Sequence, residues 1–161
     1  MIHLKPASSA DIPQINSLAN KIWRKHYPGI ITNEQIDFML EWMYSAKSLE
    51  KQISEGAKFL IVMSGELPVG YVSFSKVEEG EFFLHKFYVD TDQHRKGIGT
   101  EIFNEVIALM DQPKSITLTV NRQNIKAINF YFKVGFTIKS AEDFDIGNGY
   151  FMNDFVMVKK F

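Results

Sequence analysis

The chain has 161 residues, of which 45% are hydrophobic and 14% aromatic, and its formal charge at pH 7 is -1. This length and apolar content predict one domain over residues 1–161, and the dispersed charges argue against nucleic acid or a membrane as a partner. The lack of cysteine excludes disulfides, thiolate metal sites and an acyl-cysteine mechanism, and we expect no metal. The apolar runs are too short to span a membrane and the N-terminus lacks a signal-peptide core, so we expect a cytoplasmic protein.

The first part of the chain predicts a short strand followed by helices. Ile2–Pro6 alternates as a strand, and the polar run Ser8–Asp11 can start a helix whose apolar residues recur up to Trp23. Asn33 can cap a second helix, and Ser48–Ile53 can add a short third helical piece. Most of the predicted strands follow this helical region.

The pattern then changes to strands. Lys58–Ser64, Pro68–Ser75 and Glu81–Asp90 are rich in Val, Phe or Tyr, and their tight connections predict an antiparallel meander. The remaining predicted elements, in order, are a helix after Gly97, a strand at Ile116–Val120, a helix at Asn124–Val134, and strands at Phe136–Lys139 and Tyr150–Lys159. This order predicts a mixed α/β fold.

The segment Gln93–Thr100 follows a predicted strand and opens a helix. Gly97 and Gly99 would let a ligand approach the backbone, and the free amides of a helix start favour an anion such as a pyrophosphate. The alternative is an ordinary tight turn with solvated basic residues. A dinucleotide site is disfavoured, because Ile102 stands where the third glycine of that motif would lie.

A second motif lies in the helix predicted from Asn124. Asn124, Ala127, Ile128 and Tyr131 fall on one helical face that is two turns long, so one extended ligand could contact both the amide and the phenol. The alternative is that Asn124 only caps the helix and that Tyr131 fills the core with its hydroxyl at the surface.

Together, these motifs resemble the GNAT superfamily of N-acetyltransferases. The shared features, in chain order, are the strand Leu84–Val89, the turn Arg95-Lys96-Gly97-Ile98-Gly99, and the spaced residues Asn124, Ala127, Tyr131, Gly135 and Phe136. The resemblance extends from Ile2 to Phe161, with His94 where the family usually has Gln or Arg. It implies a mostly antiparallel, twisted sheet of about seven strands, split between the fourth and fifth strands and flanked by about four helices.

The resemblance also implies the co-substrate and its contacts. Acetyl-CoA would lie in the split, where the backbone of Phe87, Tyr88 and Val89 would pair with the pantetheine arm and Asn124 would contact it from the side. The pyrophosphate would be held by His94, Arg95, Lys96, Gly97, Ile98, Gly99 and Thr100. Tyr131 matches the family's general acid, which protonates the departing CoA thiolate after direct attack by the amine. A phenol suits this role because its pKa of about 10 keeps it protonated near neutrality.

Two further predictions concern the base and the acceptor-binding residues. His85, on the predicted strand that leads to the turn, is the candidate base, and a chain of water molecules is the alternative. Trp23, Tyr27 and His85 are the candidate acceptor-binding residues, because aromatic rings can receive a cationic amine. For the two aromatic residues, helix–helix packing is the alternative.

A looser similarity to bacterial polyamine N-acetyltransferases is carried by Trp23–Pro28, Ile36–Ser45 and Tyr150–Phe161. It favours a small amine such as a polyamine as the acceptor. The alternatives are acetylation of a protein N-terminus or lysine, and a non-catalytic module that binds acetyl-CoA. Exposed aromatic residues in the final strand would suit a homodimer.

Overall fold

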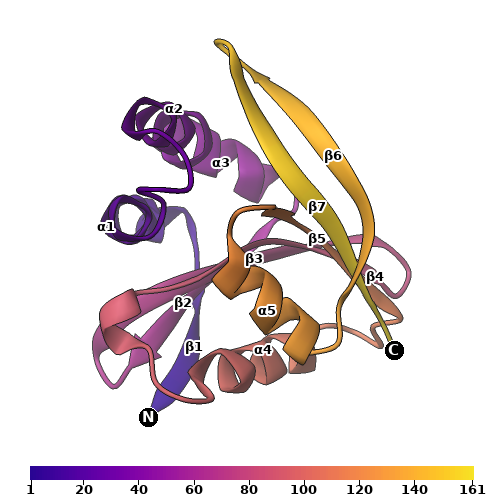
Figure 1. Ribbon diagram of the computed structural model, residues 1–161. Helices are drawn as coiled ribbons and strands as arrows, with labels where there is room; N and C mark the ends of the chain where they lie inside the picture. Colours follow the sequence, from indigo (N-terminus) through magenta and orange to yellow (C-terminus); the bar gives the residue numbers. More distant parts are fainter.

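The computed structural model describes all 161 residues, which form one seven-stranded sheet with helices on both faces (Figure 1). The strands are β1 (Ile2–Ala7), β2 (Lys58–Ser64), β3 (Leu67–Glu78), β4 (Glu81–Val89), β5 (Ser115–Asn121), β6 (Thr137–Gly147) and β7 (Tyr150–Lys160). The α-helices are α1 (Ile12–His26), α2 (Asn33–Tyr44), α3 (Ala46–Ser54), α4 (Ile98–Ala108) and α5 (Ile125–Lys133). Short 3-10 helices lie at Ser9–Asp11 and Thr91–Gln93. The predicted mixed α/β fold is confirmed, with the third helical piece forming a helix of its own.

The strand order in the sheet is β1-β2-β3-β4-β5-β7-β6. β2, β3 and β4 form an antiparallel meander, as their short connections predict, and β1 pairs antiparallel with β2 at the edge of the sheet. β4 and β5 are parallel and are joined through α4. The β4–β5 ladder holds three residue pairs, from Glu81–Ser115 to Phe83–Thr117, and the strands are unpaired beyond it. The split expected between the fourth and fifth strands is therefore present.

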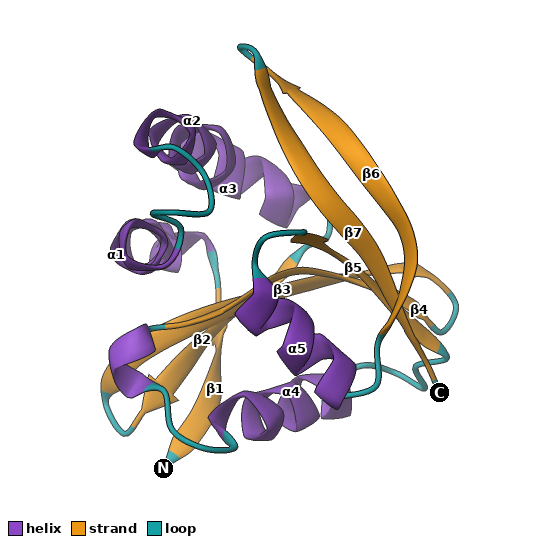
Figure 2. Ribbon diagram, in the orientation of Figure 1, coloured by secondary structure: helices purple, strands orange, loops and turns teal.

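Helices cover both faces of the sheet (Figure 2), and a hydrophobic core lies under each group of helices. α1, α2 and α3 cover one face, where Trp23, Tyr44 and Tyr71 are fully buried. α4 and α5 cover the other face, where Phe103 and Phe136 are fully buried. Burial of a large apolar side chain contributes about 1.5–3 kcal/mol, so each core fixes its helices firmly to the sheet.

β6 and β7 form a long hairpin that extends beyond the rest of the sheet (Figure 1). The strand predicted at Phe136–Lys139 is too short, since β6 continues to Gly147. Most β6 side chains are exposed, so the strand is held by pairing with β7 and carries little of the apolar alternation that predicts a strand.

The hairpin contacts α2 near its turn. Gln35 Nε2 donates to the Phe151 carbonyl at 2.8 Å, and the rings of Phe38 and Tyr150 have centroids 5.1 Å apart. These contacts join the helical layer to β7 on the face of the sheet that α1, α2 and α3 cover.

Three of the five α-helices, α2, α3 and α5, begin at a polar residue whose side chain accepts a hydrogen bond from the first turn. Thr32, and not the predicted Asn33, caps α2, because its Oγ1 accepts a hydrogen bond from the Gln35 amide at 3.1 Å. Ser8 caps the 3-10 helix before α1, as the polar run there predicts. No helix is both long enough and apolar enough to cross a membrane.

Candidate active site

A cavity of about 520 Å³ lies where β4 and β5 separate. Residues of α1 and α2 line it on one side and residues of α4 and α5 on the other. All residues predicted for the site are in its lining: Trp23, Tyr27, His85, Phe87, Tyr88, Val89, His94, Arg95, Lys96, Gly97, Ile98, Gly99, Thr100, Asn124 and Tyr131. The fold therefore brings them together, while the role of each stays a prediction.

β4 forms one wall of the cavity. Beyond Phe83 it has no partner on the β5 side, which leaves backbone groups of Leu84–Val89 free to pair with an extended ligand, except the Val89 carbonyl, which is bonded to His94. A β-bulge at His85 interrupts the pairing with β3 between Leu84 and Lys86. Because the bulge adds one residue to β4, simple alternation does not predict which face the following side chains occupy.

The start of α4 forms a cradle of backbone amides beside the cavity. The N–H groups of Lys96, Gly97, Gly99 and Thr100 donate no hydrogen bond within the chain. Gly97 is the N-cap, with a φ of 83°, a left-handed conformation that glycine adopts readily. Unpaired amides and the helix dipole both favour an anion, so this amide cradle fits the pyrophosphate of CoA.

Gly99 also has a packing role that the sequence did not reveal. A Cβ at this position would lie 2.8 Å from Cε1 of Phe130 on α5. The glycine therefore allows α4 to pack closely on α5. At Gly97, by contrast, a Cβ would meet no atom within 4 Å, so the need for glycine there is conformational.

The side chains of the turn are engaged with other parts of the chain. Arg95 pairs with Glu101 at 2.7 Å. The Val89 carbonyl can only accept, so His94 donates to it through Nε2–H at 3.0 Å and accepts from Lys126 Nζ through Nδ1 at 2.9 Å. His94 thus joins the end of β4 to α5 and holds Lys126 in the cavity wall.

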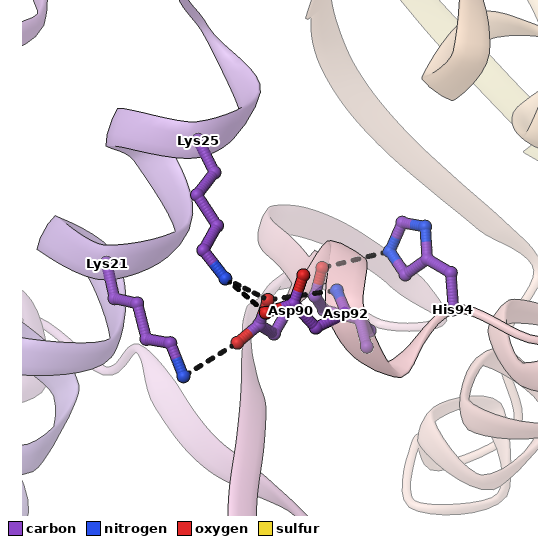
Figure 3. A network of polar contacts seen from close by, with 6 residues as sticks. Lys21, Lys25, Asp90, Asp92 and His94 are labelled. Carbon is purple, nitrogen blue, oxygen red and sulfur yellow. Dashed lines mark hydrogen bonds and ion pairs between the residues drawn. The ribbon is translucent and has the colours of Figure 1, made fainter.

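Asp90 anchors the turn that precedes the amide cradle (Figure 3). Lys21 Nζ lies 2.9 Å from one carboxylate oxygen and Lys25 Nζ lies 3.1 Å from the other. Burial opposes ionisation of Asp90, but hydrogen bonds from Lys21, the Asp92 amide and Lys25 outweigh it and lower the pKa of Asp90 to about 2. Figure 3 places His94 on the opposite side of the same turn. Asp90 therefore ties α1 to the segment that leads into the cradle.

Asn124 lies at the start of α5, between the two sides of the cavity. Its Oδ1 accepts from the Ala127 amide at 3.4 Å and lies 3.2 Å from Nε2 of His26 on α1. The capping alternative is therefore present in the structure. Asn124 also lines the cavity, so a contact with pantetheine stays a prediction beside it.

Tyr131 packs its ring in the core and presents its hydroxyl to the cavity. The ring centroid lies 5.6 Å from that of Phe136. The hydroxyl has no hydrogen-bond partner in the chain. It is also not sealed from solvent, because Ser73 Oγ is the one polar side-chain atom that is both sealed and unpaired. Burial, with a smaller effect of Tyr27, raises the pKa of Tyr131 well above its usual value. The phenol is therefore protonated and open to a ligand.

Aromatic residues form the cavity wall beside α1. The Tyr27 hydroxyl lies 2.9 Å from the Tyr88 hydroxyl, and burial raises the pKa of Tyr27 to about 12. Trp23 packs against Tyr27 with ring centroids 4.3 Å apart and ring planes tilted by 39°, but its Nε1 donates to the Tyr71 hydroxyl at 3.0 Å within the core. For Trp23 the packing alternative is therefore present, while Tyr27 offers the cavity a polar group.

β4 places His85 and Lys86 on the face covered by α1, α2 and α3. His85 Nε2 lies 2.7 Å from Ser75 Oγ. The residue as a whole is exposed, but its imidazole lies against Phe83, and the loss of solvent there, with the charge of Lys86, lowers the pKa of His85 to about 4. Lys86 donates to Gln52 Oε1 at 2.6 Å, and burial lowers its pKa to about 8. His85 is therefore neutral at pH 7 and only weakly basic.

Eight polar residues in the lining were not predicted as site residues, and five of them are basic or acidic: His26, Lys86, Lys126, Lys133 and Asp154. They lie outside the glycine turn, and none of them was singled out for a role within the segments that carry the family resemblance. Asp154 is the clearest omission, since it lies within β7 and is 3% exposed. An acidic residue inside a largely apolar strand is the one signal that indicates such a group before the structure is known.

A split sheet with an amide cradle at the opening and a protonated phenol in the cavity is the arrangement expected of an acyl-CoA-dependent N-acyltransferase. A family model described as an acetyltransferase (GNAT) domain matches residues 30–150. The chain therefore belongs to the GNAT N-acetyltransferases, a family that uses acetyl-CoA.

Relatives cover the whole chain. A spermidine N(1)-acetyltransferase of Thermoplasma acidophilum is 24% identical over 167 residues, which cover 99% of this chain and 98% of the relative. The crystal structure of PaiA N-acetyltransferase from the same organism, in complex with coenzyme A, matches with a TM-score of 0.82 at 25% identity and covers 100% of this chain and 99% of that one. The peptidyl-lysine N-acetyltransferase YjaB of Salmonella typhimurium is 27% identical over 93 residues, 58% of this chain and 59% of the relative. The names of these relatives differ in acceptor, so the family alone does not define it.

Proposed function

We propose that this protein transfers the acetyl group of acetyl-CoA to a small amine such as a polyamine. The observation that carries the proposal is the single cavity that joins the amide cradle, the Tyr131 hydroxyl and the aromatic wall beside α1. The unpaired amides suit a pyrophosphate, and the unpaired edge of β4 suits the amides of pantetheine. Acetyl-CoA, when bound, supplies the thioester that the amine attacks.

In the proposed reaction Tyr131 is the general acid. A CoA thiol resembles a cysteine thiol, with a pKa of about 8.5, so a phenol with a raised pKa gives up its proton only as the thiolate forms. The base is His85 or a chain of water molecules. The low pKa of His85 makes it a weak proton acceptor, and Asp154 lines the same cavity as another candidate.

The contacts between α2 and β7 support a small acceptor. Gln35 bonds to the Phe151 carbonyl, and Phe38 packs on Tyr150, so the hairpin and the helical layer meet at the acceptor end. This closure suits a short amine better than an extended peptide, which would need an open groove.

A thiol-release assay with acetyl-CoA tests the proposal against a panel of polyamines, amino acids, aminoglycosides and peptides. We expect the highest kcat/KM with a diamine or polyamine. Thiol release with peptides alone would instead indicate a protein acetyltransferase. Binding of CoA without thiol release from any amine would indicate a non-catalytic module, and either result would refute the proposal.

A further inference from the structure

Asp154 is a buried carboxylate that the reaction proposed above names only as one candidate for the base. It lies on β7 opposite Asn121 of β5, is 3% exposed, and is the one carboxylate in the lining of the cavity. The next residue, Phe155, packs on the core under α4 and α5. Alternation along the strand therefore places Asp154 on the face covered by α1, α2 and α3, where the acceptor is expected.

No cation of the chain neutralises this carboxylate. None of the ion pairs includes it. The nearest guanidinium, from Arg122, donates to the backbone carbonyl of Asp154 at 3.2 Å and pairs with the carboxylate of Asp143 at 2.6 Å. Buried charges in proteins are normally paired, so an unpaired carboxylate in a cavity wall indicates a cationic ligand.

The surroundings leave Asp154 ionised at neutral pH but basic enough to accept a proton. Burial raises its pKa to about 6, against the opposing effects of the Arg122 charge and a hydrogen bond from Thr119. Titratable groups also line the cavity from the neighbouring elements: His26 and Tyr27 at the end of α1, Lys86 and Tyr88 on β4, and Tyr131 on α5. On β6 the residue opposite Asp154 in the strand ladder is the exposed Glu142. Burial lowers the pKa of His26, so this histidine adds no cation at pH 7.

Building on the proposed function, we propose that Asp154 binds the ammonium group of the acceptor and takes its first proton. The neutral nitrogen then forms the N–C bond to the thioester carbonyl, the C–S bond breaks, and the thiolate takes the proton of the Tyr131 hydroxyl. The second proton of the nitrogen restores the Tyr131 phenol, and the proton on Asp154 passes to solvent. The products are the acetylated amine, the CoA thiol and one proton, so the step balances.

The same arrangement favours aliphatic ammonium acceptors over amines that are neutral at pH 7. Lys86, on the opposite wall, opposes a second ammonium group beside β4. The remaining cationic part of a diamine would therefore extend along the β6–β7 side. Asp154 therefore has two roles in the proposal: it is the base, and it selects the acceptor.

The test compares Asp154→Asn with Glu142→Gln, a control that removes an exposed carboxylate from the neighbouring strand on the same face. With 1,4-diaminobutane and acetyl-CoA at pH 7, we expect kcat/KM of Asp154→Asn to fall about 10²- to 10⁴-fold, and that of Glu142→Gln to change by less than about threefold. Acetyl-CoA affinity should be unchanged. The melting temperature of Asp154→Asn should equal or exceed that of the wild type, because an unpaired buried charge has been removed.

The pH profile separates this role from a structural one. Wild-type kcat/KM should level off above about pH 6, whereas that of Asp154→Asn should rise about tenfold per pH unit up to the pKa of the amine, because only free amine reacts. Turnover of Asp154→Asn within about threefold of wild type, or an equal loss in Glu142→Gln, would overturn the assignment.

A binding measurement on the wild-type protein decides the question if Asp154→Asn does not fold. The affinity of 1,4-diaminobutane for the complex with CoA should fall about tenfold per pH unit below about pH 6. An affinity that is constant between pH 5 and pH 8 would overturn the role of Asp154. Failure of the wild type to release thiol with any amine would instead refute the proposed function, and this titration would still decide whether Asp154 binds ammonium groups.

Discussion

Replacement of Asp90 by Asn tests how the fold holds the turn before the amide cradle. Asp90 accepts hydrogen bonds from Lys21 and Lys25 of α1 and from the Asp92 amide, and its side chain is 4% exposed. The variant keeps the shape of the side chain and removes its charge. We expect it to loosen the link between α1 and the turn, and so to lower both stability and CoA affinity.

The expected loss of stability follows from the pKa of Asp90. Its value of about 2 in the folded chain compares with 3.8 for an unperturbed aspartate. At about 1.4 kcal/mol per pKa unit, the ionised carboxylate contributes about 2 kcal/mol to the free energy of unfolding. Because the folded-state pKa is the lower one, this contribution is complete above about pH 4 and is lost as the pH falls toward 2.

Urea unfolding of wild type and Asp90→Asn at several pH values measures this contribution. We expect a difference of about 2 kcal/mol at pH 7, equivalent to a melting shift of about 4–8 °C, that shrinks below pH 4 and nearly vanishes at pH 2. Asp92→Asn is the matched control, because Asp92 is 68% exposed and its ion pair with Lys25 is worth less than about 1 kcal/mol. Equal losses in both variants, or a difference independent of pH, would refute the reasoning.

Three further variants test the cavity. Tyr131→Phe should lower kcat by about 10²- to 10⁴-fold with little change in melting temperature or acetyl-CoA affinity, since its hydroxyl has no partner in the chain; steady-state kinetics and a thermal melt on one sample check this. Gly97→Val should lower stability by about 1–2 kcal/mol and weaken CoA binding in calorimetry, because valine resists a φ of 83°. Lys126→Ala should weaken CoA binding while the KM of the amine stays unchanged, because Lys126 lies on the cradle side of the cavity, held by His94.

Much of the fold could be predicted because apolar periodicity records which face of each element is buried. The strand at Lys58–Ser64 has the predicted bounds, and Glu81–Val89 ends one residue earlier than expected. The full length of β6 was not predicted, since this strand is exposed and is held by pairing with β7, which leaves almost no apolar pattern in the sequence. The bulge at His85 was not predicted either, because one extra residue in a strand leaves the composition of the segment typical of a strand.

Some features of the site depend only on neighbouring residues in the sequence, whereas others depend on how distant elements pack. The amide cradle is a local structure, formed by consecutive residues at a helix start, so the segment Gln93–Thr100 predicted its free amides, although an ordinary tight turn was the alternative and a pyrophosphate there stays a prediction. Asp154 reaches the cavity only through the pairing of β7 with β5, which no short motif records. Lys126 lies inside the segment Asn124–Tyr131, but only the packing of α5 places it in the cavity lining. For Asn124, the structure contains the capping contact that was the alternative prediction, and the same residue still faces the cavity.

The charged residues of the cavity suit two substrates of opposite charge that enter from different sides. Four cationic residues of the lining lie toward α4 and α5, namely Arg95, Lys96, Lys126 and Lys133, whereas the lining carboxylate, Asp154, lies on the opposite face of the sheet. In the proposed reaction, the anionic cofactor would therefore be attracted to the α4 and α5 side of the split and the ammonium group to Asp154, while Lys86 on the same face as Asp154 would oppose an ammonium group beside β4. The Tyr131 hydroxyl lies in the same cavity and makes no hydrogen bond or ion pair with the charged residues on either side. Because β4 and β5 pair over three residues and then separate, the sheet itself supplies the opening in which the two proposed substrates would meet.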